Sequence, residues 1–392
     1  MSKDYLNSIP AERFATIIPR RRAVIESASA EMPRYEYNAN VLARDLHPKV
    51  QHVVVSDVKE LFNARLYTLV PDKEQGTDKL AYYQAGQYIS LDLSINGSRL
   101  TRPYSLCSAP STGEYQIMVK NMKNGFASEY INSNFRVGTR VDVSEPSGFF
   151  YHEPLRDSNK VVGIAGGSGI APFISMARAI AEGIEDFELI LLYGSRTEEE
   201  ILFKEELDEL ERKCSKIKVI HVLSDEEREG YRHGFISADL IGEFCEGGSV
   251  FACGSQGMYD YIRGETDKLG LPIRRVRFDA YGEYRLGKRD EGRFETGKVY
   301  ELTVKTNDGQ THVIPARSDE SILVAVERAG IKAPSKCRSG ECGWCRTRLV
   351  SGEVYIPEMT ERRRQYDKVA GYIHACCSFP KSDCVITVNC EL

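Results

Sequence analysis

Four cysteines near the end of the chain constrain its fold more than any other feature. Cys337, Cys342 and Cys345 follow the spacing C-x4-C-x2-C, and Cys376 comes after 30 further residues. This is the plant-type spacing for a [2Fe-2S] cluster, in which one loop supplies three thiolates and a distant segment supplies the fourth. Zinc usually takes two C-x2-C pairs, so the four-residue gap fits it poorly. We therefore expect a [2Fe-2S] cluster held by these four residues.

The residues around these cysteines agree with a cluster loop. Gly340 and Gly343 would let the loop curl closely and turn its N–H groups toward the sulfides. Cys377 is the rival for the fourth ligand position. Cys384 and Cys390 are in phase with apolar residues of an expected strand, so we interpret them as core residues.

The stretch from Cys337 to Cys345, followed by Ala375-Cys376-Cys377-Ser378, resembles the ferredoxin-like domain fused to the C-terminus of oxygenase reductases. The resemblance implies a β-grasp domain at this end of the chain. Trp344 departs from the family pattern, which usually has a small residue there. Its ring is either an exposed anchor for a docking partner or a residue that packs within its own domain.

Composition narrows the class of protein. The chain has 392 residues, enough for two to four domains, and a net charge of -5 without a basic face, which argues against nucleic acid as a ligand. Seven of the 11 cysteines follow Cys253, a clustering that favours metal ligation over a disulfide framework. We find no apolar run near the ~18 residues of a membrane span and no export signal, so a cytoplasmic protein is expected.

The pattern along the chain predicts a multidomain protein of α+β and α/β type. Short β-rich runs separated by turns fill residues 49–147, whereas strands and helices alternate from about residue 159, as in a parallel sheet with crossover helices. The predicted parts are an N-terminal extension (1–47), an antiparallel β-barrel (48–155), a parallel α/β domain (156–282), a linker (283–297) and the β-grasp, ferredoxin-like domain (298–392). The extension carries three consecutive arginines at 20–22 and is either a packing arm, a flexible extension or a docking element.

Two short motifs in the predicted barrel suit a flavin. The sequence Arg102-Pro103-Tyr104-Ser105 offers a guanidinium for a phosphate, a ring to stack on an isoalloxazine and a hydroxyl for the flavin edge. The sequence Gly125-Phe126-Ala127-Ser128 can present N–H groups and a hydroxyl to a second phosphate. Each motif alone also occurs in ordinary barrel turns.

Together with 86–88 and 146–149, these motifs resemble the flavin domain of the ferredoxin-NADP reductase superfamily. The resemblance implies that Arg102, Tyr104 and Ser105 bind the flavin and that Ser105 lies near the nitrogen that accepts hydride. The G-x-x-S element of Gly125 and Ser128 favours FAD, because a diphosphate needs more donors than a single phosphate. FMN is the alternative.

Two glycine-containing turns follow apolar strands of the predicted parallel sheet. One runs from Gly166 to Pro172 and leads into a helix, and the other is the Cys253-Gly254 step. Glycines allow a ligand to approach closely, and ligands gather at the carboxyl ends of parallel strands. The candidate nicotinamide-binding residues here are Gly167, Ser168, Gly169, Pro172, Cys253 and Gly254.

The region 161–281 resembles the pyridine-nucleotide domain of the same superfamily. That resemblance implies that Cys253 lines the hydride-transfer site and acts there with Ser105; a buried core cysteine is the alternative. Gly194 and Arg196 follow another strand, without the acid that would grip a ribose diol. Arg196 either holds the 2′-phosphate of NADPH or is a solvated residue, so NADH and NADPH both stay open.

The order of the motifs suggests an NAD(P)H-dependent oxidoreductase. Nicotinamide gives electrons as a pair and a [2Fe-2S] cluster takes them singly, so a flavin, which can do both, belongs between them. The chain resembles the reductases of phthalate dioxygenase and phenylacetate epoxidase systems, which implies an oxygenase component as the electron acceptor. The extension is absent from the usual family outline, so another metalloenzyme, from an anaerobic pathway, is the second candidate. A diaphorase and a redox sensor are the remaining alternatives.

Charge predicts how the acceptor docks. From residue 298 onward the chain has 14 Lys and Arg against 12 Asp and Glu, a side-chain charge of about +2. Four thiolates and an oxidised cluster add about -2, from the charges of iron and sulfide. The domain is therefore close to neutral, and we expect docking with only mild salt dependence.

Overall fold

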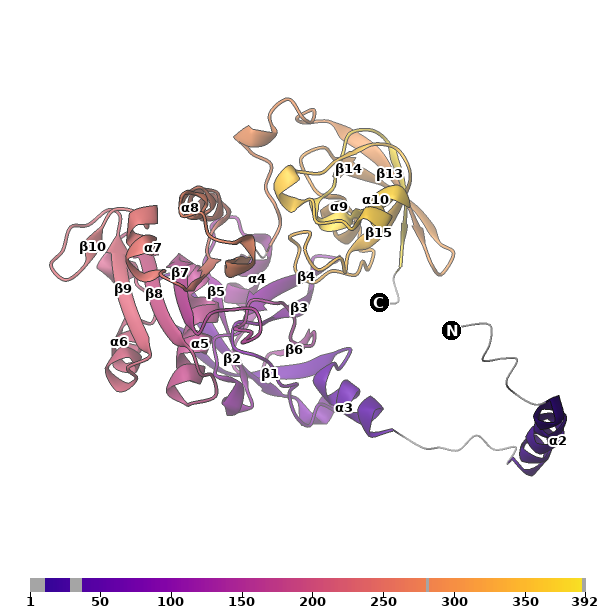
Figure 1. Cartoon of the computed structure of the whole chain (residues 1–392). Coiled ribbons are helices and arrows are strands. Elements are labelled where there is room, and N and C mark those ends of the chain that lie inside the picture. Colours follow the sequence, from indigo (N-terminus) through magenta and orange to yellow (C-terminus); the bar gives the residue numbers. More distant parts are fainter. Residues whose placement is uncertain (1–10, 29–36, 280–281, 390–392) are drawn as a thin grey trace. The chain divides into compact units, whose positions relative to one another are not determined.

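The computed structural model describes residues 11–28, 37–279 and 282–389 (Figure 1). The chain forms two compact units, Met1–Asp45 and Leu46–Leu392. The first holds helix α2 (Ala11–Ser27) and most of helix α3 (Asn38–Leu46), which sequence analysis did not predict. Residues 20–22 are exposed on α2. Whether this extension docks a partner stays a prediction.

The first sheet of the second unit is antiparallel and has the strand order β4-β3-β6-β1-β2-β5. An isolated bridge joins Leu106, just after β4, to Ile117 in β5, so the two ends of the sheet approach each other. Alternate side chains in the first half of β1 are buried, whereas β2 has four consecutive buried residues. The elements are β1 (Gln51–Glu60), β2 (Ala64–Pro71), β3 (Tyr88–Ile95), β4 (Ser98–Ser105), β5 (Tyr115–Lys120), β6 (Arg140–Val143) and helix α4 (Phe126–Asn134).

The second sheet is parallel throughout, with the order β10-β9-β8-β7-β11-β12. Its central strands are almost continuously buried because crossover helices cover the sheet, as sequence analysis predicted. The strands are β7 (Lys160–Gly166), β8 (Glu188–Ser195), β9 (Ile217–Leu223), β10 (Arg232–His233), β11 (Ser249–Cys253) and β12 (Val276–Asp279). The helices are α5 (Ala171–Ala181), α6 (Lys204–Lys213), α7 (Ala238–Phe244) and α8 (Gln256–Lys268).

The third sheet is mixed and has the order β14-β13-β19-β15-β17, with helix α9 (Ile322–Arg328) contributing buried side chains to the same core. Its strands are β13 (Val299–Thr306), β14 (Thr311–Arg317), β15 (Arg346–Ser351), β17 (Tyr372–His374) and β19 (Cys384–Val388); β16 (Val354–Tyr355) and β18 (Phe379–Pro380) form a separate pair, and α10 (Gln365–Val369) is short. Cys384 is buried in β19, as predicted, whereas Cys390 lies outside the described residues. The predicted fold class, a β-barrel, a parallel α/β domain and a ferredoxin-like domain, is confirmed.

The predicted linker is an ordered segment without strands. Its short turn Lys288–Asp290 ends at a buried carboxylate, Asp290, which accepts hydrogen bonds from the hydroxyls of Tyr284 (3.2 Å) and Tyr355 (2.7 Å). The predicted domain boundaries stay predictions, although each sheet falls within one of them. No helix in the described part of the chain is long and apolar enough to cross a membrane.

The turn between β7 and α5 depends on a glycine. An added Cβ at Gly169 would lie 2.0 Å from the carbonyl oxygen of Cys253, which is a backbone atom that cannot easily move. We therefore expect Gly169→Ala to lower the free energy of unfolding by roughly 1–3 kcal/mol, the usual cost of overpacking. Urea unfolding followed by circular dichroism measures this change.

Gly264→Ala in α8 is the matched control, because nothing lies within 4 Å of its added Cβ. It should leave stability unchanged or raise it by up to ~1 kcal/mol through helix propensity. Equal unfolding midpoints for the two variants would contradict the packing argument.

Candidate functional site

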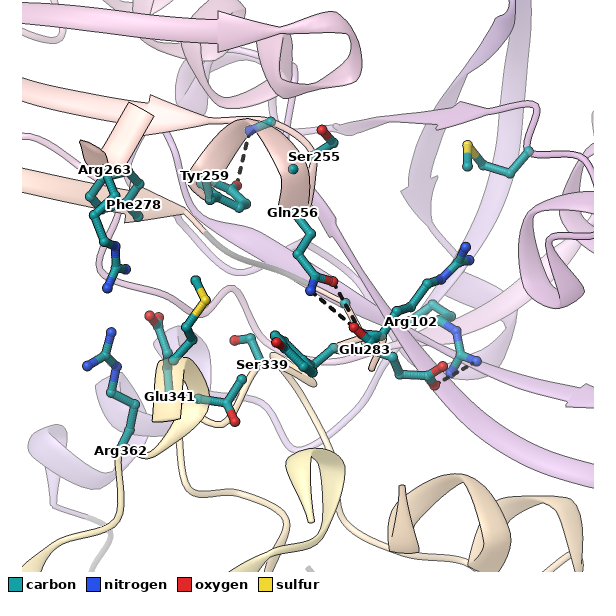
Figure 2. A pocket seen from close by; sticks show the side chains of 18 of the residues that line it. Arg102, Ser255, Gln256, Tyr259, Arg263, Phe278, Glu283, Ser339, Glu341 and Arg362 are labelled. Atoms are coloured by element: carbon teal, nitrogen blue, oxygen red, sulfur yellow. Dashed lines mark hydrogen bonds and ion pairs between the residues drawn. The ribbon is translucent and has the colours of Figure 1, made fainter. Parts of the chain in front are cut away.

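One large cavity lies where segments of the three sheets meet (Figure 2). Its volume is about 1190 Å³, more than the roughly 300–1,000 Å³ of a typical small-molecule site. The walls come from the end of β4, the start of α4, the start of α8, the segment after β12 and the loop that carries the cysteines. The cavity is thus bordered by segments of both short flavin motifs (102–105 and 125–128) and by the loop that carries three of the predicted cluster cysteines.

Of the four predicted flavin residues at 102–105, two line the cavity and two do not. Arg102 and Tyr104 line the cavity, whereas Pro103 and Ser105 do not. Both pairs belong to strand β4, so successive side chains point to opposite faces. The Arg102 guanidinium lies 3.1 Å from the Glu283 carboxylate, and burial lowers the pKa of this arginine.

The second flavin motif forms one wall of the cavity at the beginning of α4. Gly125, Ala127 and Ser128 all line it, and Gly125 caps the helix. An added Cβ at Gly125 would lie 2.2 Å from Ser128 Oγ and 2.9 Å from the Met122 carbonyl. Position 125 therefore has no room for a side chain, and the Gly125 N–H itself donates to the Met122 carbonyl at 2.9 Å.

Only one of the predicted nicotinamide-binding residues in the two glycine-containing turns lines the cavity. Gly254 lines the cavity, but Gly167, Ser168, Gly169, Pro172 and Cys253 do not. Cys253 is 7% exposed, and its Sγ lies 3.8 Å from Asp279 Oδ2. Burial and the Asp279 carboxylate raise the pKa of the Cys253 thiol well above its usual range. This residue is therefore a neutral thiol beside the cavity.

Tyr259 fixes the backbone at this end of the sheet. Its hydroxyl accepts a hydrogen bond from the Gly254 N–H at 3.0 Å and donates one to the Asp279 carbonyl. The carboxyl ends of β11 and β12 are thereby held together at the cavity wall.

Gly194 and Arg196 lie apart from the cavity, at the end of β8 and just after it. The Arg196 guanidinium is 67% exposed and pairs with Glu200, its Nε at 3.1 Å from the carboxylate. An exposed pair of this kind is weak, because water and salt screen both charges.

The four predicted cluster cysteines are arranged as two pairs. Cys345 Sγ lies 3.2 Å from Cys376 Sγ, and the Cys337 sulfur accepts a hydrogen bond from the Cys342 N–H at 3.3 Å. Within the described part of the chain, no three His, Cys, Asp or Glu side chains converge on a single metal position. Two pairs suit a cluster with two irons better than one tetrahedral zinc ion.

The cysteine loop supplies hydrogen-bond donors to sulfur. The Trp344 N–H donates to Cys342 Sγ at 3.4 Å, and Gly340 and Gly343 have φ values of 83° and 69°, which let the loop curl. The neighbouring Cys342 thiol, with backbone N–H groups, holds the pKa of Cys337 well below its usual range. Ser339, through its backbone and its buried hydroxyl, is a further neighbour that lowers the pKa of Cys337. The loop therefore fits the group that the cysteine spacing predicts.

The sequence left alternatives open for Cys377 and Trp344, and the structure gives the contacts of both. The Cys377 thiol donates to the carbonyls of Thr360 (3.7 Å) and His374 (3.5 Å), whereas Cys376 faces Cys345. The Trp344 ring is 38% exposed, and the Lys336 ammonium lies 3.7 Å from its centroid.

Sequence analysis missed several residues of the cavity wall. Figure 2 shows Arg263 of α8 and Arg362 of the third sheet's domain reaching toward each other, with Glu341 near Arg362. These residues carry no local motif, because their shared position arises only when α8 and the cysteine loop come together. The missed residues that line the cavity include Gln256, Tyr259, Arg263, Phe278, Glu283, Glu341 and Arg362.

Comparison with known proteins agrees with this arrangement. Residues 51–152 match the Oxidoreductase FAD-binding domain family, residues 164–264 the Oxidoreductase NAD-binding domain family, and residues 305–381 the 2Fe-2S iron-sulfur cluster binding domain family. These three matches settle the cofactors as FAD, NAD(P)H and a [2Fe-2S] cluster.

Among curated relatives, the chain is 31% identical over 312 residues to the ferredoxin reductase component of 3-ketosteroid-9-alpha-monooxygenase from Mycobacterium tuberculosis, covering 77% of this chain and 84% of that protein. It is 27% identical over 325 residues to one component of the 1,2-phenylacetyl-CoA epoxidase of Escherichia coli, covering 79% and 89%.

Among solved structures, phthalate dioxygenase reductase, described as modular for electron transfer from pyridine nucleotides to [2Fe-2S], matches with a TM-score of 0.62 and 27% identity. The match covers 87% of this chain and 98% of that protein. The chain therefore belongs to the ferredoxin-NADP reductase superfamily, as an NAD(P)H-dependent oxidoreductase of the oxygenase-reductase type with a C-terminal [2Fe-2S] domain.

Proposed function

We propose that this chain takes electron pairs from NAD(P)H and delivers them singly to an oxygenase component. The observation that carries the proposal is the cavity at which β4, α4, α8 and the cysteine loop meet. When bound, the flavin supplies the change from hydride to single electrons, and the cluster supplies the one-electron outlet.

On the flavin side, we assign Arg102, Tyr104, Gly125 and Ser128 to binding. Arg102 offers a planar guanidinium to a phosphate, and the Gly125–Ser128 turn adds N–H groups at a helix start. Ser105 does not line the cavity, so its role near the hydride-accepting nitrogen rests on the family resemblance and is kept as a proposal.

On the nicotinamide side, we assign Gly254 to contact and Cys253 to shape the wall. The Cys253 thiol donates toward Asp279, and Tyr259 holds the backbone of Gly254. Because the thiol is buried directly behind Gly254 and its pKa is raised, it adds no charge to this wall. Gly167, Ser168, Gly169 and Pro172 form the adjacent turn.

For the cluster, we assign Cys337 and Cys342 to one iron and Cys345 and Cys376 to the other. Three of these side chains are buried, whereas Cys342 is exposed. Of the four, Cys342 is therefore the ligand that we propose an acceptor reaches, while Ser339 and Glu341 of the same loop border the cavity. The names of the relatives, a ferredoxin reductase component of a steroid monooxygenase and a component of an epoxidase, support an oxygenase component as that acceptor.

Removing the Arg102 guanidinium should weaken flavin binding. A charged hydrogen bond contributes about 1.5–3 kcal/mol, so Arg102→Ala should raise the FAD dissociation constant about tenfold to a hundredfold. Fluorescence titration of the deflavinated full chain measures it. Arg99→Ala, an exposed arginine of the same strand, is the control and should bind FAD like the wild type. An unchanged constant in Arg102→Ala would remove Arg102 from the site.

The fourth ligand can be tested with two neighbouring cysteines. Cys376→Ser should abolish the visible absorption and reduced-state EPR signal of the cluster while NAD(P)H still bleaches the flavin, because the flavin site is a separate module. Cys377→Ser should keep both signals, since its thiol bonds to carbonyls. Loss of flavin reduction in Cys376→Ser, or loss of the cluster in Cys377→Ser alone, would overturn this assignment.

The acceptor is tested by adding the isolated oxygenase component from the same organism. The wild-type chain should reduce it, and Cys376→Ser should not; equal turnover by both would indicate a diaphorase. Because the cluster domain is nearly neutral, the transfer rate should change less than about threefold between low and physiological ionic strength. A steep fall with salt would show that charge steers docking.

A further inference from the structure

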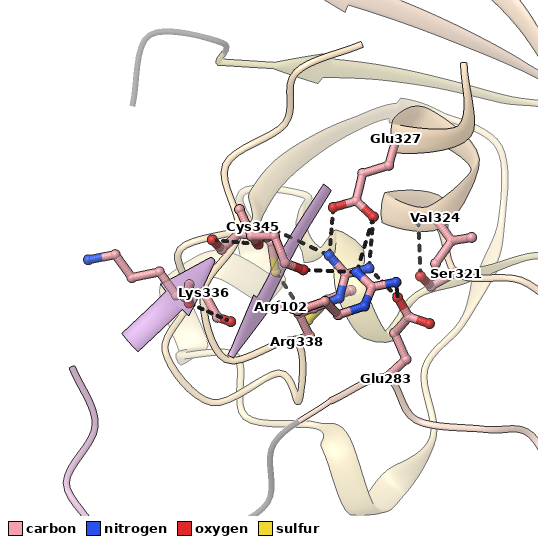
Figure 3. A network of polar contacts seen from close by, with 12 residues as sticks. Arg102, Glu283, Ser321, Val324, Glu327, Lys336, Arg338 and Cys345 are labelled. Atoms are coloured by element: carbon pink, nitrogen blue, oxygen red, sulfur yellow. Dashed lines mark hydrogen bonds and ion pairs between the residues drawn. The ribbon is translucent and has the colours of Figure 1, made fainter. Parts of the chain in front are cut away.

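A buried group of four charges joins the flavin strand to the cysteine loop (Figure 3). It consists of Arg102 in β4, Glu283 in the segment after β12, Glu327 in α9 and Arg338, the residue after Cys337. We call it the charge network. Figure 3 shows the guanidinium groups of Arg102 and Arg338 lying between the carboxylates of Glu327 and Glu283.

Arg338 is the centre of the charge network. Its side chain has 0% exposure, and its two terminal nitrogens bond to the Glu327 carboxylate at 2.6 and 2.8 Å. A second ion pair joins it to Glu283. A buried guanidinium is costly unless opposite charge surrounds it, and here two arginines face two glutamates. These contacts fix the direction of the Arg338 side chain.

The backbone at this point is also held in an unusual conformation. Arg338 has a φ of 59°, in the left-handed region that strains a non-glycine residue. Such a residue persists when its surroundings determine its position. The Cys337 carbonyl, one residue earlier, accepts a hydrogen bond from the Gly282 N–H at 3.1 Å.

The residues that precede Cys337 also contact the flavin-domain part of the chain. Thr101 Oγ1 donates to the Ser335 carbonyl at 3.1 Å, and the Lys336 ammonium lies 2.5 Å from the Glu145 carboxylate. Thr101 and Glu145 belong to the flavin-domain part of the chain. Cys337 is therefore held from both flanks against the domain that binds the flavin.

We propose that Arg338 is a positioning residue: through Glu327, Glu283 and Arg102 it fixes the cluster loop at the distance from the flavin that electron transfer requires. The proposal rests on the proposed function, because it takes Cys337 as a ligand and Arg102 as part of the flavin site. Glu327 and Arg338 lie outside the cavity wall. Hydride transfer to the flavin should thus not depend on them.

The test uses the full-length, cofactor-loaded chain and a double variant that removes one positive and one negative charge together. Arg338→Met leaves two glutamates against one arginine and is prone to misfold. Arg338→Met/Glu327→Gln instead leaves Arg102 paired with Glu283, so stability should recover while the link to the loop is lost. Arg328→Met, an exposed neighbour in α9 that pairs with Glu320, is the matched control.

Anaerobic stopped-flow mixing with NAD(P)H follows flavin and cluster bleaching separately. In the double variant we expect flavin bleaching at the wild-type rate and cluster bleaching slower by at least severalfold, because electron transfer slows steeply as the distance between the two centres grows. Hydrogen exchange in 335–345 should accelerate, and the EPR signal of the dithionite-reduced cluster should match the wild type. The control should match the wild type in every measurement.

Three results would overturn the proposal. Cluster bleaching at the wild-type rate in the double variant would show that the charge network only neutralises buried charge. Unchanged hydrogen exchange in 335–345 would show that it does not hold the loop, and equal slowing of flavin and cluster bleaching would place its action on the flavin site. A wild-type chain without flavin and cluster absorption would instead refute the proposed function.

Discussion

A guanidinium buried away from water is costly unless carboxylates lie beside it. In this chain the carboxylates beside one such guanidinium come from distant segments. Arg338 sits one residue after a candidate cluster ligand, yet its partners are Glu327 of α9 and Glu283 of the segment after β12. Glu283 also pairs with Arg102 of the flavin strand. Neutralising this one buried charge therefore places the cysteine loop beside β4, and the shared cavity is formed by the same approach.

The strands and helices could be predicted from the sequence where the determining pattern is local. The runs at 115–120 and 249–253 are strands with those bounds, because most residues of the first and all residues of the second are buried. The charge network could not be predicted, since Arg338 and Glu283 are 55 residues apart and no periodicity relates them. The same holds for Arg263 and Arg362 in the cavity wall.

The motif at 102–105 illustrates the limit for the candidate site. From the sequence alone, all four residues are expected to face one ligand. In the structure they are the last residues of β4, and a strand turns alternate side chains to opposite faces, so Arg102 and Tyr104 line the cavity while Pro103 and Ser105 lie behind it. The residue types indicated the chemistry correctly, but which of them can touch a ligand depended on recognising a strand instead of a turn.

Two cysteines that are five residues apart in the cysteine loop lie in different surroundings. Cys337 is 2% exposed and hydrogen-bonded to the segment that follows the nucleotide-binding sheet, whereas Cys342, five residues on, is exposed. Left-handed turns at Arg338, Gly340 and Gly343 make this change of environment within a few residues. If these thiols hold the same iron, that iron would have one ligand buried beside the flavin-domain part of the chain and one ligand that is exposed, so the C-x4-C spacing alone gives the two ligands different surroundings.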